Sequence, residues 1–514
     1  MTGRVFSVVV ALMLAPAVAR SDPATPDPAA QQSTPPAGTA APQVPPKLAE
    51  RTDFQLTLTT LDALHKKGMM TDEEYAAALR DLITVGQRAA TSPTFVVGRF
   101  VTTLYGYLEG DAIHDSQRAV NDGFGGHPVL NLPGTVQGDN GRTTFSSRGT
   151  RLGFRFAAPE VSGVRVRGNF EMDFVGNAPG SPSARPPTIS EANFFTNPTP
   201  RIRHALMQVD SDYVTFWIGQ TWNVMAFAAA FLPTSVQSQG LPGQLFGRNP
   251  QIRLSHIFDA KAFSAELAVA AVRPPQMDSE IPDLQAGLKL NANAWTGVQS
   301  IGSTSTTISP ASVAVTGAYR TFKLATAPAV NGTNTTATSS VTGSVIAVDA
   351  FLPVIPAKDR GGFAISLLGE ATTGSGFGDL LSGLTGNIAT GQPTGIAAAT
   401  YAPFQDIDAG MAAWDKNGIL RTINWRTLLL DAQISYGKVI LAGNYSNVYS
   451  DNADQFNGAI GAPWFHQTWW DVNLIVDPWP GVRFGLEYAR TLQRRVGGAL
   501  ANDSRVFFAG FFLF

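Results

Sequence analysis

The residues of this sequence best suited to chemistry are arginines and carboxylates that occupy every second position of apolar segments. In the segment 164–174, apolar residues and one glycine alternate with Arg165, Arg167, Asn169, Glu171 and Asp173. A period of two places one set of side chains on each face of a β-strand. Because the planar guanidinium of arginine pairs with a carboxylate or phosphate through two hydrogen bonds, the charged face suits the binding of anions.

The same alternation recurs between residues 94 and 514 and predicts about sixteen antiparallel strands. The predicted connections between these strands fall into two classes. Some are short turns, such as 436–438, and others are long loops, such as 223–250 and 373–420. Short turns at one rim and long loops at the other are typical of outer-membrane β-barrels.

Composition and physical chemistry favour a closed barrel over a soluble two-sheet sandwich, which is the alternative. Charged residues make up 15% of the chain, against about 25% in an ordinary soluble domain. An arginine on the lipid face near the bilayer centre costs about 2–4 kcal/mol, so the charged faces must point inward. Sheet edges cannot be left unpaired in hydrocarbon, so the sheet must close. We therefore predict an all-β fold, a transmembrane antiparallel β-barrel of about 16 strands, in which a water-filled lumen remains.

Alternation then gives the side chains expected to line the lumen. These pore-lining candidates are Arg151, Arg155, Arg165, Arg167, Glu171, Asp173, Arg253, Lys289 and Arg483, with Glu266 and Glu487 as further acidic members. We expect the first four arginines to form a cationic ladder, which favours passage of anions. Glu171 and Asp173 either oppose this ladder across the pore or neutralise it. The alternative is that all these charges pair among themselves as ordinary salt bridges.

The chain ahead of the barrel divides into three predicted segments. Residues 1–19 have the charged start, short apolar core and small-residue end of a signal peptide. Residues 20–47 are rich in Pro and Ala, as in a disordered spacer. Residues 48–92 predict a helical hairpin with a capping box from Thr71 to Glu74, and this hairpin is a candidate coiled coil in the periplasm. The barrel occupies 93–514.

Other functions are disfavoured by what the chain contains. A net charge of −2 offers no field for nucleic acid, and the 6 His and 0 Cys residues give no metal-ligand spacing. No linear catalytic or cofactor motif occurs, so we predict neither an enzyme nor a cofactor. Two alternatives stay open. One is an outer-membrane hydrolase with an active site at the rim that uses His204, and the other is an envelope tether.

Four blocks of the sequence together resemble a known family. They are SSRGTRLGFRF (146–156), VRVRGNFEMDF (164–174), RIRHALMQVDSDYVTFWIGQTWNVM (201–225) and GLEYARTLQRR (485–495). These blocks are similar to the DcaP-like trimeric outer-membrane porins, which also carry a periplasmic helical segment before the barrel. The resemblance implies a homotrimer in outer-membrane lipid that passes small anionic solutes such as carboxylates. The chain ends on Phe512 and Phe514, which look like the signal that the barrel-assembly machinery reads.

Overall fold

The computed structural model describes most of the chain from residue 52 onward. The described residues are 52–67, 70–79 except 73 and 77, 93–97, 100–118, 120, 122, 129–176, 198–237, 240–275, 279, 281–325, 338–383, 410–417, 419–458 and 461–514. The predicted signal peptide and spacer lie outside these residues. The division of the chain into segments therefore stays a prediction at its N-terminal end.

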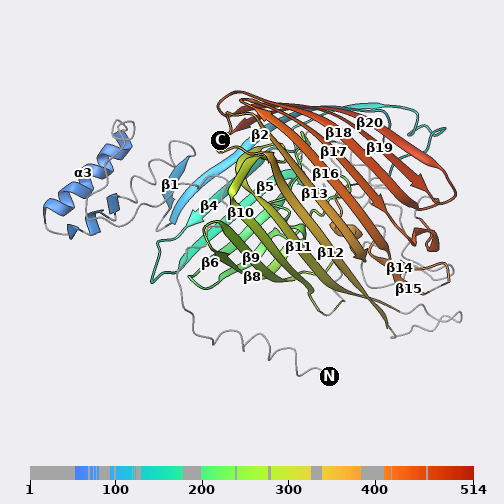
Figure 1. Cartoon of the computed structure of the whole chain (residues 1–514), viewed down its shortest axis with the longest axis horizontal. Helices are drawn as coiled ribbons and strands as arrows, with labels where there is room; N and C mark the ends of the chain where they lie inside the picture. Colours follow the sequence, from blue (N-terminus) through green and yellow to red (C-terminus); the bar gives the residue numbers. More distant parts are fainter. Residues whose placement is uncertain are drawn as a thin grey trace, which may run out of the picture.

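Apart from a separate pair, β14 (Ala412–Trp414) with β15 (Leu420–Thr422), the described strands form one antiparallel sheet that closes into a barrel of sixteen strands, which confirms the predicted fold class (Figure 1). In chain order they are β1 (Thr94–Val97), β2 (Phe100–Asp115), β3 (Arg142–Ser146), β4 (Arg151–Ala157), β5 (Arg165–Gly176), β6 (Thr199–Asp210), β7 (Thr215–Trp222), β8 (Arg248–Asp259), β9 (Phe263–Val272), β10 (Asp283–Ile301), β11 (Ser305–Ala325), β12 (Thr338–Ile355), β13 (Ala364–Ser375), β16 (Asn424–Tyr436), β17 (Val439–Tyr449), β18 (Trp464–Trp479), β19 (Val482–Arg495) and β20 (Leu500–Leu513). Both β3 and β4 pair with β2 and act as one interrupted strand, while β1 only adds a short pairing at the start of β2.

The barrel closes where the first long strand meets the last. β2 pairs with β20 over nine residues, from Tyr107↔Leu513 to Asp115↔Arg505. Gly106 and Phe514 extend this seam by exchanging two backbone hydrogen bonds of 3.0 Å. Both ends of the barrel sequence therefore lie at one rim. This rim carries the brief connections, such as 437–438 and 480–481, and we call it the short-turn rim. The opposite end is the long-loop rim.

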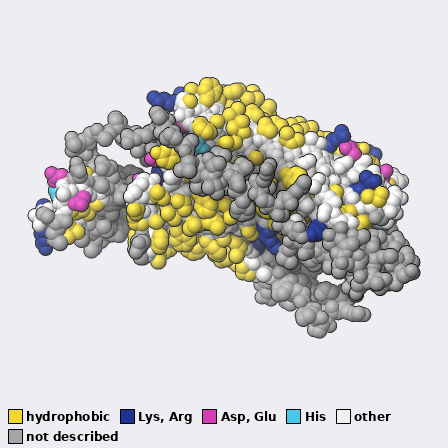
Figure 2. All heavy atoms as spheres, turned by 90° about the horizontal axis from the view of Figure 1, so that it is seen from below, with side chains coloured by type: hydrophobic (Ala, Val, Ile, Leu, Met, Phe, Trp, Pro, Cys, Tyr) yellow, Lys and Arg dark blue, Asp and Glu magenta, His cyan; other side chains and the backbone are white. Residues whose placement is uncertain are grey.

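The outer surface of the barrel is apolar, as the alternation predicts. Along β16, Leu428, Leu430 and Ile434 are exposed, while Asp431 and Gln433 between them are buried. Figure 2 shows hydrophobic side chains over most of the middle of one face. A sandwich would bury such side chains between its two sheets, so that alternative is excluded. The surface matches the lipid-facing band of transmembrane barrels.

A charge placed in the middle of this band should prevent stable assembly. Leu430 is the central residue of β16 and is 48% exposed. We expect Leu430→Arg to destabilise the folded barrel by about 2–4 kcal/mol. The matched change Tyr436→Arg, at the end of the same strand, should cost about 0–1 kcal/mol, because arginine there reaches the membrane interface. Urea unfolding in lipid vesicles measures both values. Equal costs would mean that this face does not lie in hydrocarbon.

The described part of the N-terminal segment contains α3 (Thr52–Lys66) and a helical stretch that starts at Asp72. The capping box is present, because the Glu74 N–H donates to Thr71 Oγ1 at 3.2 Å and the Thr71 N–H donates to Glu74 Oε2 at 2.8 Å. The Thr71 N–H and the Thr71 hydroxyl both donate to the Glu74 carboxylate, and these two bonds lower its pKa. The ring of His65 stacks on Tyr75, which joins the two helical stretches. None of the helices among the described residues has the length and hydropathy that a membrane span requires. Association as a coiled coil stays a prediction.

Candidate pore constriction

The connection between β7 and β8, residues 223–247, folds into the barrel and is here called the lumen loop. Near its start, the Val224 N–H donates to Gln285 Oε1 on β10 at 3.1 Å, and the Ala226 N–H donates to Thr316 Oγ1 on β11 at 2.9 Å. Ala226 has a φ of 58°, a conformation that non-glycine residues adopt at some energetic cost. Wall side chains thus satisfy backbone groups that a loop in the interior would otherwise leave unpaired.

Carboxylates on the far wall hold the middle of the lumen loop. Glu487 Oε2 on β19 accepts from Ser235 Oγ at 2.9 Å and from the Gln237 N–H at 3.2 Å. Asp431 on β16 accepts from the Thr234 N–H. Hydrogen bonds to charged acceptors are the stronger kind, with a net contribution of about 1.5–3 kcal/mol each. The loop therefore crosses the lumen and is fastened on the side opposite the strands from which it leaves.

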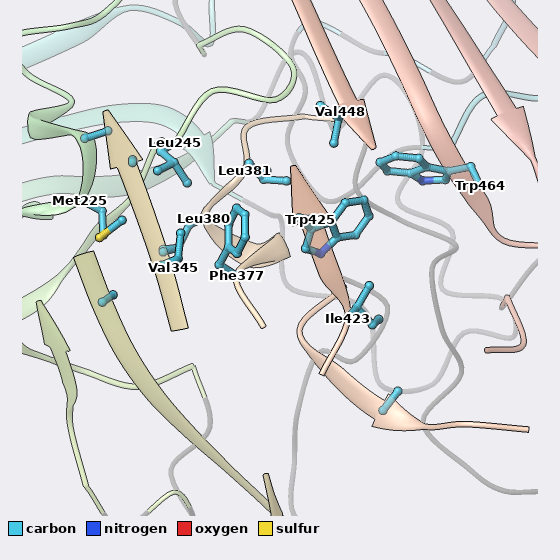
Figure 3. Packing of buried hydrophobic residues seen from close by; sticks show 14 of the residues in the cluster. Met225, Leu245, Val345, Phe377, Leu380, Leu381, Ile423, Trp425, Val448 and Trp464 are labelled. Carbon is cyan, nitrogen blue, oxygen red and sulfur yellow. The ribbon is translucent and has the colours of Figure 1, made fainter. Parts of the chain in front are cut away.

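A second segment packs against the lumen loop from the connection between β13 and β16. Ser382 and residues 243–244 exchange backbone hydrogen bonds, and the Phe246 N–H donates to the Leu380 carbonyl at 2.7 Å. Figure 3 shows Phe377, Leu380 and Leu381 lying between Leu245 and Trp425. This apolar cluster fills one part of the interior, so the lumen is narrower there than the barrel itself.

Basic side chains concentrate on the wall formed by β4, β5 and β6. Arg203 Nε donates to Glu171 Oε1 at 2.6 Å, and Arg151 Nε lies 3.4 Å from the same oxygen. Asp173 accepts from Arg203 at 3.1 Å and from Arg201 at 2.6 Å. The two carboxylates thus lie among the arginines, which is the neutralising arrangement and not the opposing one. Because three arginines (Arg151, Arg201 and Arg203) surround two carboxylates, the group keeps one net positive charge.

The remaining predicted pore-lining residues lie in separate places. Arg253 and Lys289 share Glu266, at 2.7 and 3.1 Å. Arg167 pairs with Asp210 at 2.6 Å, and the guanidinium of Arg155 lies over the Tyr105 ring, 4.2 Å from its centre. Arg483 pairs with Asp477 at 2.6 Å, near the short-turn rim. Arg165 forms no ion pair with any residue that the structure describes. The geometry therefore favours extensive pairing, and no continuous four-arginine ladder forms.

Sequence reasoning missed two groups of charged residues. Arg201 and Arg203 follow the same period of two inside a segment already singled out, so alternation could have identified them. The second group consists of buried carboxylates within strands on the far side: Asp349, Glu370, Asp431 and Asp471. We call them the acidic wall. The signal is clearest in β12 and β13, where Asp349 and Glu370 are the single charged residues of their strands. The basic wall and the acidic wall face the lumen loop from different sides.

A cavity of about 230 Å³ lies between the basic wall and the lumen loop. Arg151, Arg203, Trp222 and Phe246 line it, as does the turn 301–305. The lumen loop contributes Ser235, Gln237, Gly240, Leu241 and Gln244. Gln237 Oε1 and Gln244 Nε2 are buried in its lining without a hydrogen-bond partner in the described part of the chain. His204 also lines the cavity, where its Nδ1 lies 3.1 Å from Thr221 Oγ1. Cations, amides and two aromatic rings thus surround a space large enough for a small organic solute.

A closed sixteen-strand barrel whose lumen is crossed by a long loop is the architecture of porins. No family model matches the chain, and no curated protein matches its sequence. Among solved structures, the chain is similar to the outer membrane channel DcaP of Acinetobacter baumannii, with 16% identity, a TM-score of 0.54, and coverage of 81% of this chain and 97% of that one. It is also similar to an anion-selective porin from Comamonas acidovorans, with 10% identity, a TM-score of 0.43, and coverage of 81% and 100%. The first of these likenesses agrees with the family resemblance of the sequence and establishes the fold.

Proposed function

We propose that this protein is an outer-membrane porin, a channel for the passive diffusion of small hydrophilic solutes. The observation that carries the proposal is the lumen loop, which narrows a sixteen-strand barrel and leaves a polar cavity of about 230 Å³ beside it. A barrel whose only task was to anchor an envelope tether would need neither the loop nor a polar cavity. A lumen lined by charged and amide side chains suits water and solutes that carry polar groups.

Anions such as carboxylates are the solutes that the constriction favours. Arg151 and Arg203 line the cavity, and together with Arg201 they exceed the two carboxylates that pair with them, Glu171 and Asp173, by one positive charge. A carboxylate entering beside them gains charge-assisted hydrogen bonds. The amide of Gln244, which is 0% exposed, can donate to the same group. The nine predicted pore-lining residues therefore divide in our proposal, with Arg151 and Glu171 at the constriction and the others along the wall or near the rims.

The proposal includes a homotrimer in outer-membrane lipid, with the short-turn rim and the N-terminal helices in the periplasm. Recognition by the barrel-assembly machinery is proposed to use the C-terminal strand. In this strand, the Phe512 side chain is 55% exposed on the outer face. The backbone of Phe514 extends the pairing of β20 with β2 through its two hydrogen bonds with Gly106.

Single-channel recording of the purified full chain in a planar bilayer tests the function. We expect conductance in steps of three and a reversal potential in a KCl gradient that reports anion preference. Added dicarboxylates should block the current at the constriction, because they compete with chloride for Arg151 and Arg203. Glucose, which is of similar size and uncharged, is the matched control and should block less. Absence of conductance would contradict the channel, and hydrolysis of ester or peptide substrates would then favour the hydrolase.

A further inference from the structure

The hairpin between β10 and β11 extends beyond the wall to which it belongs. Pairing of β10 with β9 ends at Ala292↔Phe263, and pairing of β11 with β12 ends at Ser312↔Phe351. Past these points the two strands pair only with each other, from Thr296↔Pro310 to Ile301↔Ser305. A register shift between Ala292 and Thr296 marks the bend. We call residues 296–310 the hairpin tip. The tip leaves the barrel wall at the short-turn rim.

The hairpin tip lies inside the barrel and reaches the opposite wall. Ser366 Oγ on β13 donates to the Val298 carbonyl at 2.8 Å, and the Ser300 N–H donates to Gln433 Oε1 on β16 at 2.9 Å. Arg483 on β19 donates to the Ser303 carbonyl and to Thr306 Oγ1, both at 2.9 Å. β19 lies six strands beyond β11 in a barrel of sixteen. The tip therefore crosses the lumen.

The hairpin tip also meets the lumen loop and closes one side of the cavity. Thr234 Oγ1 donates to the Ser300 carbonyl at 3.0 Å, and the Gly302 N–H donates to the Pro233 carbonyl at 3.2 Å. Gln299 Nε2 donates to the Ala230 carbonyl at 2.7 Å. The turn 301–305 lines the cavity itself. A solute in the cavity is therefore separated from the short-turn rim by this hairpin.

The contacts of the hairpin tip are of a kind that water can replace. They are mainly hydrogen bonds to Ser, Thr and Gln, each with a net contribution of about 0.5–1.5 kcal/mol, because the same groups bond to water when released. The two hydrogen bonds from the charged Arg483 are stronger, at about 1.5–3 kcal/mol each. The lumen loop, in contrast, is also held by the apolar cluster around Leu245 and Trp425. The tip joins the wall through β10 and β11 at the register shift. Release of its hydrogen bonds therefore frees the tip to move about that point.

We propose that the hairpin tip is a gate on the short-turn side of the cavity. It swings about the register shift at Ala292–Thr296 and lets a bound solute leave toward the periplasm. Arg483 holds the gate closed, because its guanidinium donates hydrogen bonds to the tip. The carboxylate of Asp477 fixes this guanidinium by accepting from its Nε at 2.6 Å and from its Nη2 at 2.7 Å. This inference rests on the proposed channel function and adds a moving element to the same site.

Shortening the hairpin tests the gate. Gly297 and Ser309 are register partners, so Val298–Ile308 is replaced by Asn-Gly, which closes a two-residue hairpin turn. We expect the single-channel conductance of the full chain to rise at least about twofold, because the obstruction is removed while the barrel strands stay intact. Arg483→Gln should increase the fraction of time in the larger conductance state. Lys261→Gln removes the same charge from an exposed position at the same rim, in the turn between β8 and β9, and should leave the current unchanged.

A reversible lock supplies the opposite perturbation. The chain contains 0 Cys, so Ser300→Cys with Gln433→Cys introduces the only two thiols, which are joined by oxidation or by a short bis-thiol reagent. Locking should reduce carboxylate flux into vesicles, and cleavage of the link should restore it. Equal conductance of the shortened variant and the wild type, or unchanged flux after locking, would overturn the gate and leave the channel intact. Loss of conductance in every variant and the wild type would overturn the channel and the gate with it.

Discussion

A chain that carries Arg151→Gln and Arg203→Gln should lose its preference for anions and favour cations. Both side chains line the cavity, and Glu171 and Asp173 remain beside it when they are removed. The local charge then changes from net positive to net negative. We expect the anion-to-cation permeability ratio to fall by about tenfold, which corresponds to about 1.4 kcal/mol. The reversal potential in a KCl gradient measures this ratio, and its sign should invert.

The control for this double change removes two equal charges far from the cavity. Arg421 and Arg426 pair with Asp415 and Asp451 near the long-loop rim, where their side chains are 48% and 67% exposed. Arg421→Gln with Arg426→Gln should leave the sign of the reversal potential unchanged. Unpaired buried carboxylates destabilise a fold, so resistance of the barrel to heating in detergent must be recorded for each variant. A folded Arg151→Gln, Arg203→Gln channel with wild-type selectivity would contradict the proposed constriction.

Releasing the lumen loop should have the second large effect. Asp431→Asn with Glu487→Gln removes two charged acceptors that receive three hydrogen bonds from residues 234–237. Weakening these bonds by about 1 kcal/mol each lets the loop leave the far wall for a measurable fraction of time. We expect frequent transitions to a larger conductance and faster amide hydrogen exchange confined to 234–237.

Loss of charge alone should not reproduce this behaviour. Asp451→Asn with Asp454→Asn removes two acids from exposed positions in the connection between β17 and β18, away from the lumen loop. This control should keep the steady wild-type current. A steady current in the Asp431→Asn, Glu487→Gln channel, together with unchanged hydrogen exchange, would mean that the apolar cluster around Leu245 is sufficient to hold the loop.

The barrel could be predicted because its signal is local. Each strand reveals its lipid face within about ten residues, as in β5, where charged and apolar side chains alternate without interruption. Closure then follows from the need to pair every strand edge in hydrocarbon. The number of strands follows from counting these segments. The prediction of about sixteen strands and the observed barrel agree for that reason.

The constriction could not be predicted in the same way, because long-range partners set its path. Thr234 meets Asp431 almost two hundred positions later in the chain, and Ser235 meets Glu487 still further on. Neither loop nor partner carries a periodic pattern that points to the other. The hairpin tip is similar, since residues 297–300 are all buried after the register shift at Ala292–Thr296, and no pattern in the tip points to its partners on the opposite wall. The position of Arg203 on the lumen face, in contrast, can be predicted from the sequence, because it belongs to a strand with regular alternation.

The seam between β2 and β20 has a consequence for biogenesis. Asp111 pairs with Ala509, so the first and last strands become neighbours only after some four hundred residues have been exported. Until then the nascent sheet has two bare edges, and each offers its backbone groups to any extended chain nearby. Folding cannot finish while the polypeptide is still being delivered, and an incomplete copy would remain an open ribbon prone to aggregate.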